Sequence, residues 1–263
     1  MLNESIIVIG NKPYKQLQLN KIIDEWDKNI RCNFGLPSNN NGTKYYDHFL
    51  NVHCYINVII NNMSTMDTYK RCVDLNYLEY FKKNFNKRHY KKIYRQNNNH
   101  KRNYNIFLKN IQCPYIFKKH PRCGCNAVFE HLLHNKHKIY ITHFNINNTN
   151  KDKYSHRYVN ESKLKKKTSC HDVDNEVDIL IWLHNNNYID VTLSILEDTE
   201  IPTCNCIHVK PSLIILTLIL THYDKIILLN YTYDLNDLNE LNDSNDFIIE
   251  KNDDNIILKK HNI

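Results

Sequence analysis

The chain has 263 residues, 41% of them hydrophobic and 24% charged, and a formal net charge of +7. This length allows a sizeable buried core, so one α/β domain is expected, and the positive charge favours anionic partners. The most apolar run, 213–220, is far shorter than a membrane helix of roughly 20 residues, which argues against a membrane span. No secretory signal pattern precedes the nine cysteines, so we expect a cytoplasmic protein with reduced thiols.

The first half of the chain begins with a strand, a turn and a helix. Residues 6–9 are a β-branched run that ends at Gly10, which is typical of a strand buried on both faces of a parallel sheet. Apolar residues then recur at helical spacing over 17–26. Further along, we predict strands at 30–34 and 52–60, helices at 77–85, 104–110 and 125–134, and a strand at 138–144.

The second half continues the alternation after a polar, cationic stretch at 147–168, which we interpret as a small lid. The acidic, Asn-rich tail 234–263 is expected to be loosely held. The order of elements predicts an α/β fold with a Rossmann-like wound parallel sheet, in one domain at 1–233. The elements predicted after the lid are a helix at 172–184, strands at 189–195 and 203–209, a helix at 211–221 and a strand at 225–229.

The turn after the first strand is the first candidate site. Gly10-Asn11-Lys12-Pro13 stands at the carboxyl end of that strand, where parallel sheets bind ligands and backbone N–H groups hold phosphates. The turn lacks the Gly-x-Gly-x-x-Gly pattern, which argues against a nicotinamide or flavin site. Asn11 either hydrogen-bonds a nucleotide or caps the turn, and the sequence leaves both alternatives open.

Several segments together follow the pattern of one enzyme family. The first strand with its Gly10-Asn11 turn is followed by Arg31-Cys32-Asn33 on the second predicted strand. Pro121-Arg122-Cys123-Gly124 leads into a helix, Lys138-Ile139-Tyr140-Ile141 forms the next strand, and His171 stands at the head of the helix at 172–184. In these segments the chain resembles the bacterial lipooligosaccharide sialyltransferases.

The resemblance implies a glycosyltransferase-A-like variant of the fold and an enzyme that transfers a sugar from a CMP-activated donor to a glycan hydroxyl. It implies no metal or other cofactor, because tyrosine hydroxyls replace the divalent cation, and its partners are the nucleotide-sugar donor and the glycan acceptor. A homo-oligomer is an open alternative. The roles implied are general base for His171, donor contacts for Gly10, Asn11, Asn33, Cys123 and Gly124, and phosphate donors for Tyr154 and Tyr158.

The chain also departs from the family at three motif positions. Lys12, Arg122 and Thr168 stand where the family has glycine, threonine and tyrosine. The alternative function is therefore a catalytically impaired relative or a non-enzymatic binding protein whose basic segment engages nucleic acid.

The basic segment at 82–109 mixes Lys and Arg with aromatic side chains, as a surface that tracks phosphates and stacks bases would. It contains no recognisable nucleic-acid-binding module, so we favour a solvated face and expect no nucleic-acid partner. Part of an acceptor site for an anionic glycan is a further alternative.

Thiol and imidazole groups stand close together at three places, 123–125, 170–171 and 204–208. Zinc prefers such ligands, but cysteines separated by one residue fit a tetrahedral ion poorly. We therefore predict buried free cysteines and no metal.

Overall fold

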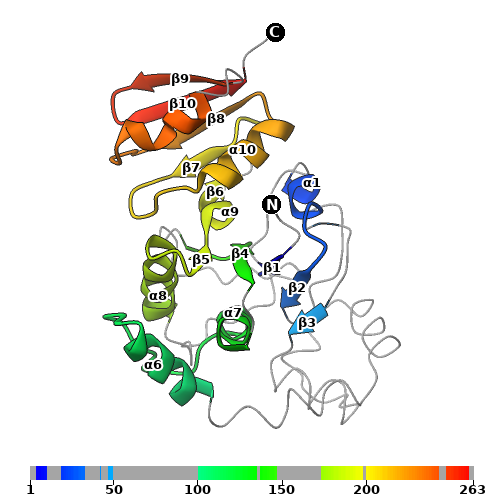
Figure 1. The fold of residues 1–263 in the computed structure, drawn as a ribbon, viewed down its shortest axis with the longest axis vertical. Coiled ribbons are helices and arrows are strands. Elements are labelled where there is room, and N and C mark those ends of the chain that lie inside the picture. Colours follow the sequence, from blue (N-terminus) through cyan, green and yellow to red (C-terminus); the bar gives the residue numbers. More distant parts are fainter. Residues whose placement is uncertain are drawn as a thin grey trace, which may run out of the picture.

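The computed structural model describes residues 4–10, 19–32, 42, 47–49, 100–134, 137–146, 173–197, 200–242 and 247–260. Over these residues the chain forms two five-stranded sheets, one above the other along the long axis of the molecule (Figure 1). Helices and strands alternate through most of the described chain, so the predicted α/β class is confirmed.

The first sheet is parallel throughout and has the strand order β3-β2-β1-β4-β5. β1 lies at its centre, and all five of its residues are buried, as its apolar sequence predicts. Ile7 of β1 pairs with Asn29 on one side and with Tyr140 on the other. The strands of this sheet are β1 (Ser5–Ile9), β2 (Asn29–Cys32), β3 (Asp47–Phe49), β4 (Lys138–Thr142) and β5 (Ile189–Asp190).

Helix α7 (Cys123–His134) packs against β1, β2, β3 and β4, and α6 (His100–Asn110) packs against α7. The contact between the two helices is aromatic. The ring centroid of Phe129 lies 4.9 Å from that of Tyr104 and 5.1 Å from that of Phe117. These pairs bury large apolar surfaces, which is where most of the stability of such a layer comes from.

The second sheet has the order β6-β7-β8-β10-β9, and only the β7-β8 pair is parallel. Helix α10 (Leu213–His222) contacts β8 of this sheet and α1 (Leu19–Ile23) next to the first sheet, so it joins the two halves. Its first turn is capped by Ser212, whose hydroxyl accepts a hydrogen bond from the Ile215 N–H at 3.3 Å. The strands are β6 (Leu196–Glu197), β7 (Thr203–Asn205), β8 (Lys225–Leu229), β9 (Phe247–Asn252) and β10 (Asn255–Lys260).

The strand predicted at 189–195 is wrong beyond Asp190. β5 ends there, and the helical turn α9 (Thr192–Ile195) follows before β6. The Asp190 carboxylate accepts a hydrogen bond from the Thr192 N–H at 2.9 Å, which turns the backbone away from the extended conformation. All four α9 residues are buried, so the apolar run reflects burial and not a strand.

The expectation of a loosely held tail is wrong for 247–260. β9 and β10 form a hairpin there, and β10 pairs with β8 over four residues. The 3-10 helix η4 (Leu235–Leu238) and α11 (Asn239–Asn242) precede it, with Leu238 and Leu241 buried. The strand predicted at 52–60, the helix at 77–85 and the lid at 147–168 lie outside the described residues, while α8 (Val173–Asn185) matches the helix predicted after the lid.

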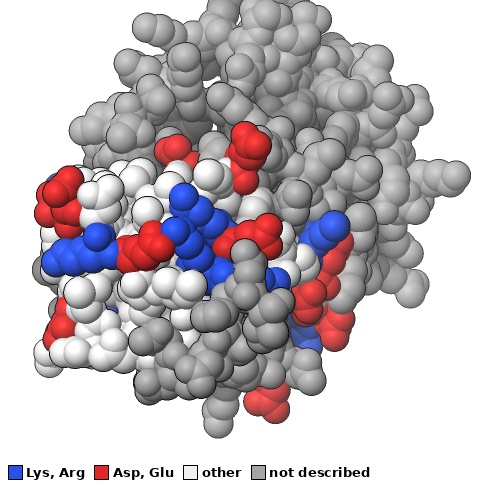
Figure 2. Space-filling model, turned by 90° about the horizontal axis from the view of Figure 1, so that it is seen from above, with Lys and Arg blue, Asp and Glu red and all other residues white. Residues whose placement is uncertain are grey.

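The end of the molecule that carries β9 and β10 has a mixed charge. Viewed from that end, Lys and Arg alternate with Asp and Glu on the described surface (Figure 2). The Lys259 ammonium lies 2.6 Å from the Glu250 carboxylate across the hairpin. Within the described part of the chain, no helix has both the length and the apolar character needed to cross a bilayer.

Candidate functional site

The carboxyl ends of β1 and β4 meet where the strand order of the first sheet reverses. β2 and β3 lie on one side of β1, and β4 and β5 lie on the other. Loops leaving neighbouring strands diverge at such a point, which makes it the usual ligand position in open parallel sheets. Gly10 and His143 directly follow the two strands there.

Gly10 allows a close approach between the ends of these two strands. Its N–H donates to the Thr142 carbonyl oxygen at 2.8 Å, which extends the β1-β4 pairing by one bond. A Cβ atom at position 10 would lie 2.4 Å from the His143 carbonyl oxygen and 2.9 Å from the Phe144 ring. Only glycine fits this position without a shift of the backbone.

Gly124 lies against the same aromatic ring. A Cβ atom at position 124 would lie 2.7 Å from Cζ of Phe144, 2.8 Å from its Cε1 and 3.6 Å from the Cys32 sulfur. Gly124 belongs to the first turn of α7, and Cys32 is the last residue of β2. The structure therefore brings together Gly10, Gly124 and the end of β2 around Phe144, and buried Cys123 begins the same helix.

His143 is a residue of this edge that sequence reasoning missed. It is 1% exposed and has φ of +61°, a left-handed conformation that histidine adopts more often than most residues. Its Nδ1 lies 3.0 Å from the Thr142 hydroxyl oxygen. Left-handed non-glycine residues gather at ligand sites, but the only sequence signal was a histidine next to Phe144 at the end of a predicted strand.

A buried carboxylate holds the beginning of α7. Glu176 of α8, whose side chain is 1% exposed, accepts hydrogen bonds from the Arg122 N–H and from the Arg122 Nε–H, both at 2.5 Å. The chain thus supplies its own anion to the turn that precedes Gly124. The same contact fixes the first turn of α8 next to the first turn of α7.

Five of the predicted site residues lie outside the described part of the chain: Asn11, Asn33, Tyr154, Tyr158 and His171. Their positions in the sequence relate three of them to described residues. Asn11 follows Gly10 directly, Asn33 follows Cys32 directly, and His171 stands two residues before α8 begins at Val173.

No protein-family model, curated protein or solved structure matches this chain. The assignment of function therefore depends on the geometry of the described residues and on the sequence motifs.

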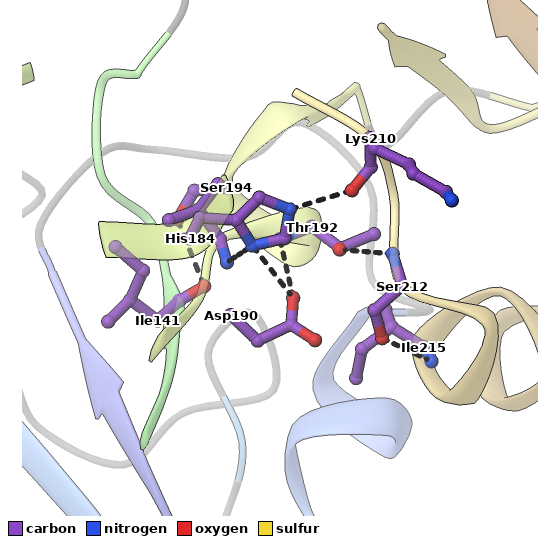
Figure 3. A network of polar contacts seen from close by, with 9 residues as sticks. Ile141, His184, Asp190, Thr192, Ser194, Lys210, Ser212 and Ile215 are labelled. Carbon is purple, nitrogen blue, oxygen red and sulfur yellow. Dashed lines mark hydrogen bonds and ion pairs between the residues drawn. The ribbon is translucent and has the colours of Figure 1, made fainter. Parts of the chain in front are cut away.

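A second polar network contains a histidine and an aspartate, but its hydrogen bonds leave it no catalytic role (Figure 3). The Val191 N–H donates to His184 Nδ1 at 3.2 Å, so this nitrogen is the acceptor and the ring is neutral. The other nitrogen, Nε2, therefore carries the proton and donates to the Lys210 carbonyl oxygen at 2.6 Å. Asp190 lies 3.9 Å from Nδ1, too far for a hydrogen bond.

This network ties α8 and α9 to the segment before α10 and to β4 of the first sheet. The Thr192 hydroxyl accepts a hydrogen bond from the Ser212 N–H at 2.9 Å, and Ser212 caps α10. The Ser194 hydroxyl donates to the Ile141 carbonyl oxygen in β4 at 3.0 Å. Because each polar group here already has a partner inside the protein, we assign the network a structural role.

The described thiols are buried. Burial raises the pKa of the Cys206 thiol to about 12, and it raises the pKa of Cys125 and Cys204 well above the ordinary value. The Glu176 carboxylate adds to the effect at Cys125, and the Arg122 guanidinium opposes it. Among the described residues, no three His, Cys, Asp or Glu side chains lie together in a group that could hold a metal ion.

Proposed function

We propose that the protein is a metal-independent glycosyltransferase of sialyltransferase type, which binds a CMP-linked sugar at the carboxyl edge of the first sheet. One observation carries the proposal. The ends of β1, β2 and β4 converge on Phe144 with the start of α7, and Glu176 holds the start of α8 to the same turn. These are the segments in which the resemblance to the family lies.

The strand order supports the Rossmann-like, glycosyltransferase-A-like part of the proposal. The order β3-β2-β1-β4-β5 is that of the first five strands of dinucleotide-binding sheets. In such sheets the nucleotide lies across the point of reversal, next to the turn after the first strand. A cytoplasmic location belongs to the same proposal.

Asn11 and Asn33 are the proposed contacts to the cytidine monophosphate. Asn33 directly follows β2, and Asn11 follows β1 after Gly10. These two strands end at the same edge of the sheet, since β1 and β2 are parallel neighbours. Amide side chains of this kind donate and accept, as recognition of a pyrimidine base and its ribose requires. Cys123 and Gly124 begin α7, whose N-terminal end favours the phosphate.

His171 is the proposed general base. A neutral imidazole accepts the proton of the acceptor hydroxyl while the hydroxyl oxygen attacks the anomeric carbon and the bond from that carbon to the phosphate oxygen breaks. His171 stands two residues before α8 begins at Val173. Tyr154 and Tyr158 are the proposed hydrogen-bond donors to the departing phosphate.

Calorimetry with cytidine, uridine and guanosine monophosphates tests this proposal, with and without EDTA. We expect binding of the cytidine nucleotide in both buffers, a loss of about tenfold or more in Asn33→Ala, and unchanged binding in His171→Ala. Asn252→Ala is the matched control, because Asn252 is exposed at the end of β9. Absence of nucleotide binding in the unaltered chain would remove the proposal.

A further inference from the structure

The positive charge of the chain is concentrated in one segment. Residues 80–129 contain thirteen of the 35 Lys and Arg residues and no Asp or Glu. All 28 acidic residues therefore lie outside this segment, and they outnumber the remaining Lys and Arg. Charge asymmetry of this kind is typical of a chain that contacts a polyanion.

The described part of this segment folds back on itself, so that its cations lie together. The Asn105 side chain donates to the Phe117 carbonyl oxygen at 3.0 Å and accepts from the Phe117 N–H at 2.9 Å. One turn earlier on α6, the Lys101 ammonium donates to the Lys118 carbonyl oxygen. These contacts place Lys101 next to Lys118. Arg102 and Lys119 follow these two residues in the sequence, and we call Lys101, Arg102, Lys118 and Lys119 the basic surface.

The basic surface is open to solvent and has aromatic and apolar side chains beside it. Arg102, Lys118 and Lys119 are exposed, and Tyr115 and Ile116 are 38% and 39% exposed on the strand-like segment that leads to Lys118. Exposed aromatic rings between cations are what base stacking along a phosphate backbone uses.

Among the described residues, Glu130 is the acidic residue that contacts this end of α6. Its carboxylate accepts a hydrogen bond from the Tyr104 hydroxyl at 2.9 Å and lies 2.9 Å from His100 Nδ1. It therefore already has partners inside the protein, and one negative charge does not balance the four cations of the basic surface.

We propose that the basic surface binds single-stranded nucleic acid, in place of the solvated face without a nucleic-acid partner that the sequence alone favours for the basic segment. Its four cations contact successive phosphates, and Tyr115 stacks on an unpaired base. Base stacking favours a single strand over a duplex, whose bases are already stacked on one another. α6 lies at the end of the molecule opposite β9 and β10 (Figure 1), and nothing in this inference depends on the proposed glycosyltransferase activity.

Fluorescence anisotropy with the full chain and labelled 20-nucleotide oligouridine and oligothymidine strands tests the inference. Because phosphate contacts release counterions, binding weakens with added salt, and a variant lacking three contacts loses about 2 from the slope of log K against log salt. We expect Arg102→Ala, Lys118→Ala and Lys119→Ala combined to bind about tenfold more weakly. Lys251→Ala with Lys260→Ala, two exposed lysines of the opposite hairpin, is the control and should bind nearly as the unaltered chain does.

Three further variants separate binding at the basic surface from effects of net charge and of unfolding. The combination of Arg102→Lys, Lys118→Arg and Lys119→Arg keeps the charge and should bind as the unaltered chain does. If circular dichroism shows that the triple alanine variant is unfolded, Lys119→Ala alone replaces it. Tyr115→Ala should weaken binding of the oligonucleotides by about fivefold or more, but not binding of inorganic polyphosphate of equal charge. The preferred strand, RNA or DNA, is the one that binds more tightly.

Three results would overturn the inference. The first is an unaltered chain that binds neither strand at 50 mM salt. The second is a triple alanine variant that binds as the control does. The third is polyphosphate binding as tight as oligonucleotide binding, since this would indicate a general affinity for polyanions.

Discussion

Gly10 and Gly124 each leave no room for a Cβ atom, but the neighbouring atoms differ: backbone at position 10 and an aromatic ring at position 124. Replacing each glycine by alanine should therefore have different consequences. At position 10 the added Cβ meets the backbone carbonyl of His143 at 2.4 Å, and at position 124 it meets the tip of the Phe144 ring at 2.7 Å. Moving the backbone at the end of a central strand pair costs free energy because it disturbs the pairing, whereas the Phe144 ring can be replaced by a shorter side chain. The test is therefore Gly10→Ala and Gly124→Ala, each alone and each combined with Phe144→Leu.

The expected changes in the free energy of unfolding follow from these contacts. Overpacking of a close-packed site costs about 1–3 kcal/mol, and Gly10→Ala should lie at the upper end of that range in both backgrounds. Gly124→Ala has a similar clash but gains about 1 kcal/mol of helix propensity, so its net cost is about 0–2 kcal/mol. Leucine has no atoms equivalent to Cζ and Cε1, so in the Phe144→Leu background Gly124→Ala should become neutral or stabilising.

Urea unfolding, followed by circular dichroism, is measured for the unaltered chain, the three single variants and the two double variants. The slope of the free energy of unfolding against urea is compared among them to exclude a change in the unfolded state. The coupling between positions 124 and 144 should be about 1–2 kcal/mol, and that between 10 and 144 smaller. A neutral Gly10→Ala, or equal rescue of both alanines by Phe144→Leu, would refute this account of the edge.

Three other changes test the electrostatics. Glu176→Ala leaves the Arg122 guanidinium without its carboxylate and should cost about 3–5 kcal/mol in urea unfolding, with Glu176→Gln costing less. Glu130 is subject to burial, which would raise its pKa, but hydrogen bonds from His100 and Tyr104 outweigh burial and lower it. The stability that Glu130 contributes is present above its ordinary pKa and is lost as pH falls through the lowered value. Glu130→Gln should therefore be destabilising at pH 7 and progressively less so as the pH falls below the ordinary pKa of glutamate. The pKa of Cys206 is raised to about 12, so its contribution is intact below about pH 9 and is lost between pH 9 and 12, and Cys206→Ala should show a shallower alkaline decline. Unfolding curves across each pH range decide the last two, and parallel curves for variant and unaltered chain would contradict them.

Strands and helices with a clear environment could be predicted from the sequence. The sequence of β1 predicts a strand because both faces of this strand are buried, and burial on both faces requires an unbroken run of apolar, β-branched residues. α10 was predicted at 211–221, with a proline in its first turn, and is observed at Leu213–His222. The structure adds that Ser212 caps it. The hairpin of β9 and β10 was missed because the acidic, Asn-rich composition of the tail 234–263 as a whole indicated a loosely held segment. The two-residue turn of the hairpin nevertheless has Asp253 at φ of +51°, as tight hairpins require.

The candidate site was predictable in part. Gly10 and Gly124 were singled out from motifs, and the structure adds that both lie on the ring of Phe144. No local pattern could have shown that ring contact, since it joins three separate segments of the chain. The same holds for Glu176, whose role depends on Arg122, 54 residues earlier in the sequence. His143 was not predicted, because nothing in the sequence around it indicates a positive φ at the end of β4.

The hydrogen bonds from His184 to Lys210 and from Ser212 to Thr192 bear on attempts to divide the protein. A fragment ending at Glu197 would keep His184 and Thr192 and lose both of their hydrogen-bond partners, Lys210 and Ser212. A fragment beginning at Glu200 would keep β7 and β8 but lose β6 from the edge of its sheet. Neither half is therefore a self-sufficient unit for crystallisation or expression, and shortened versions should be made at the ends of the chain.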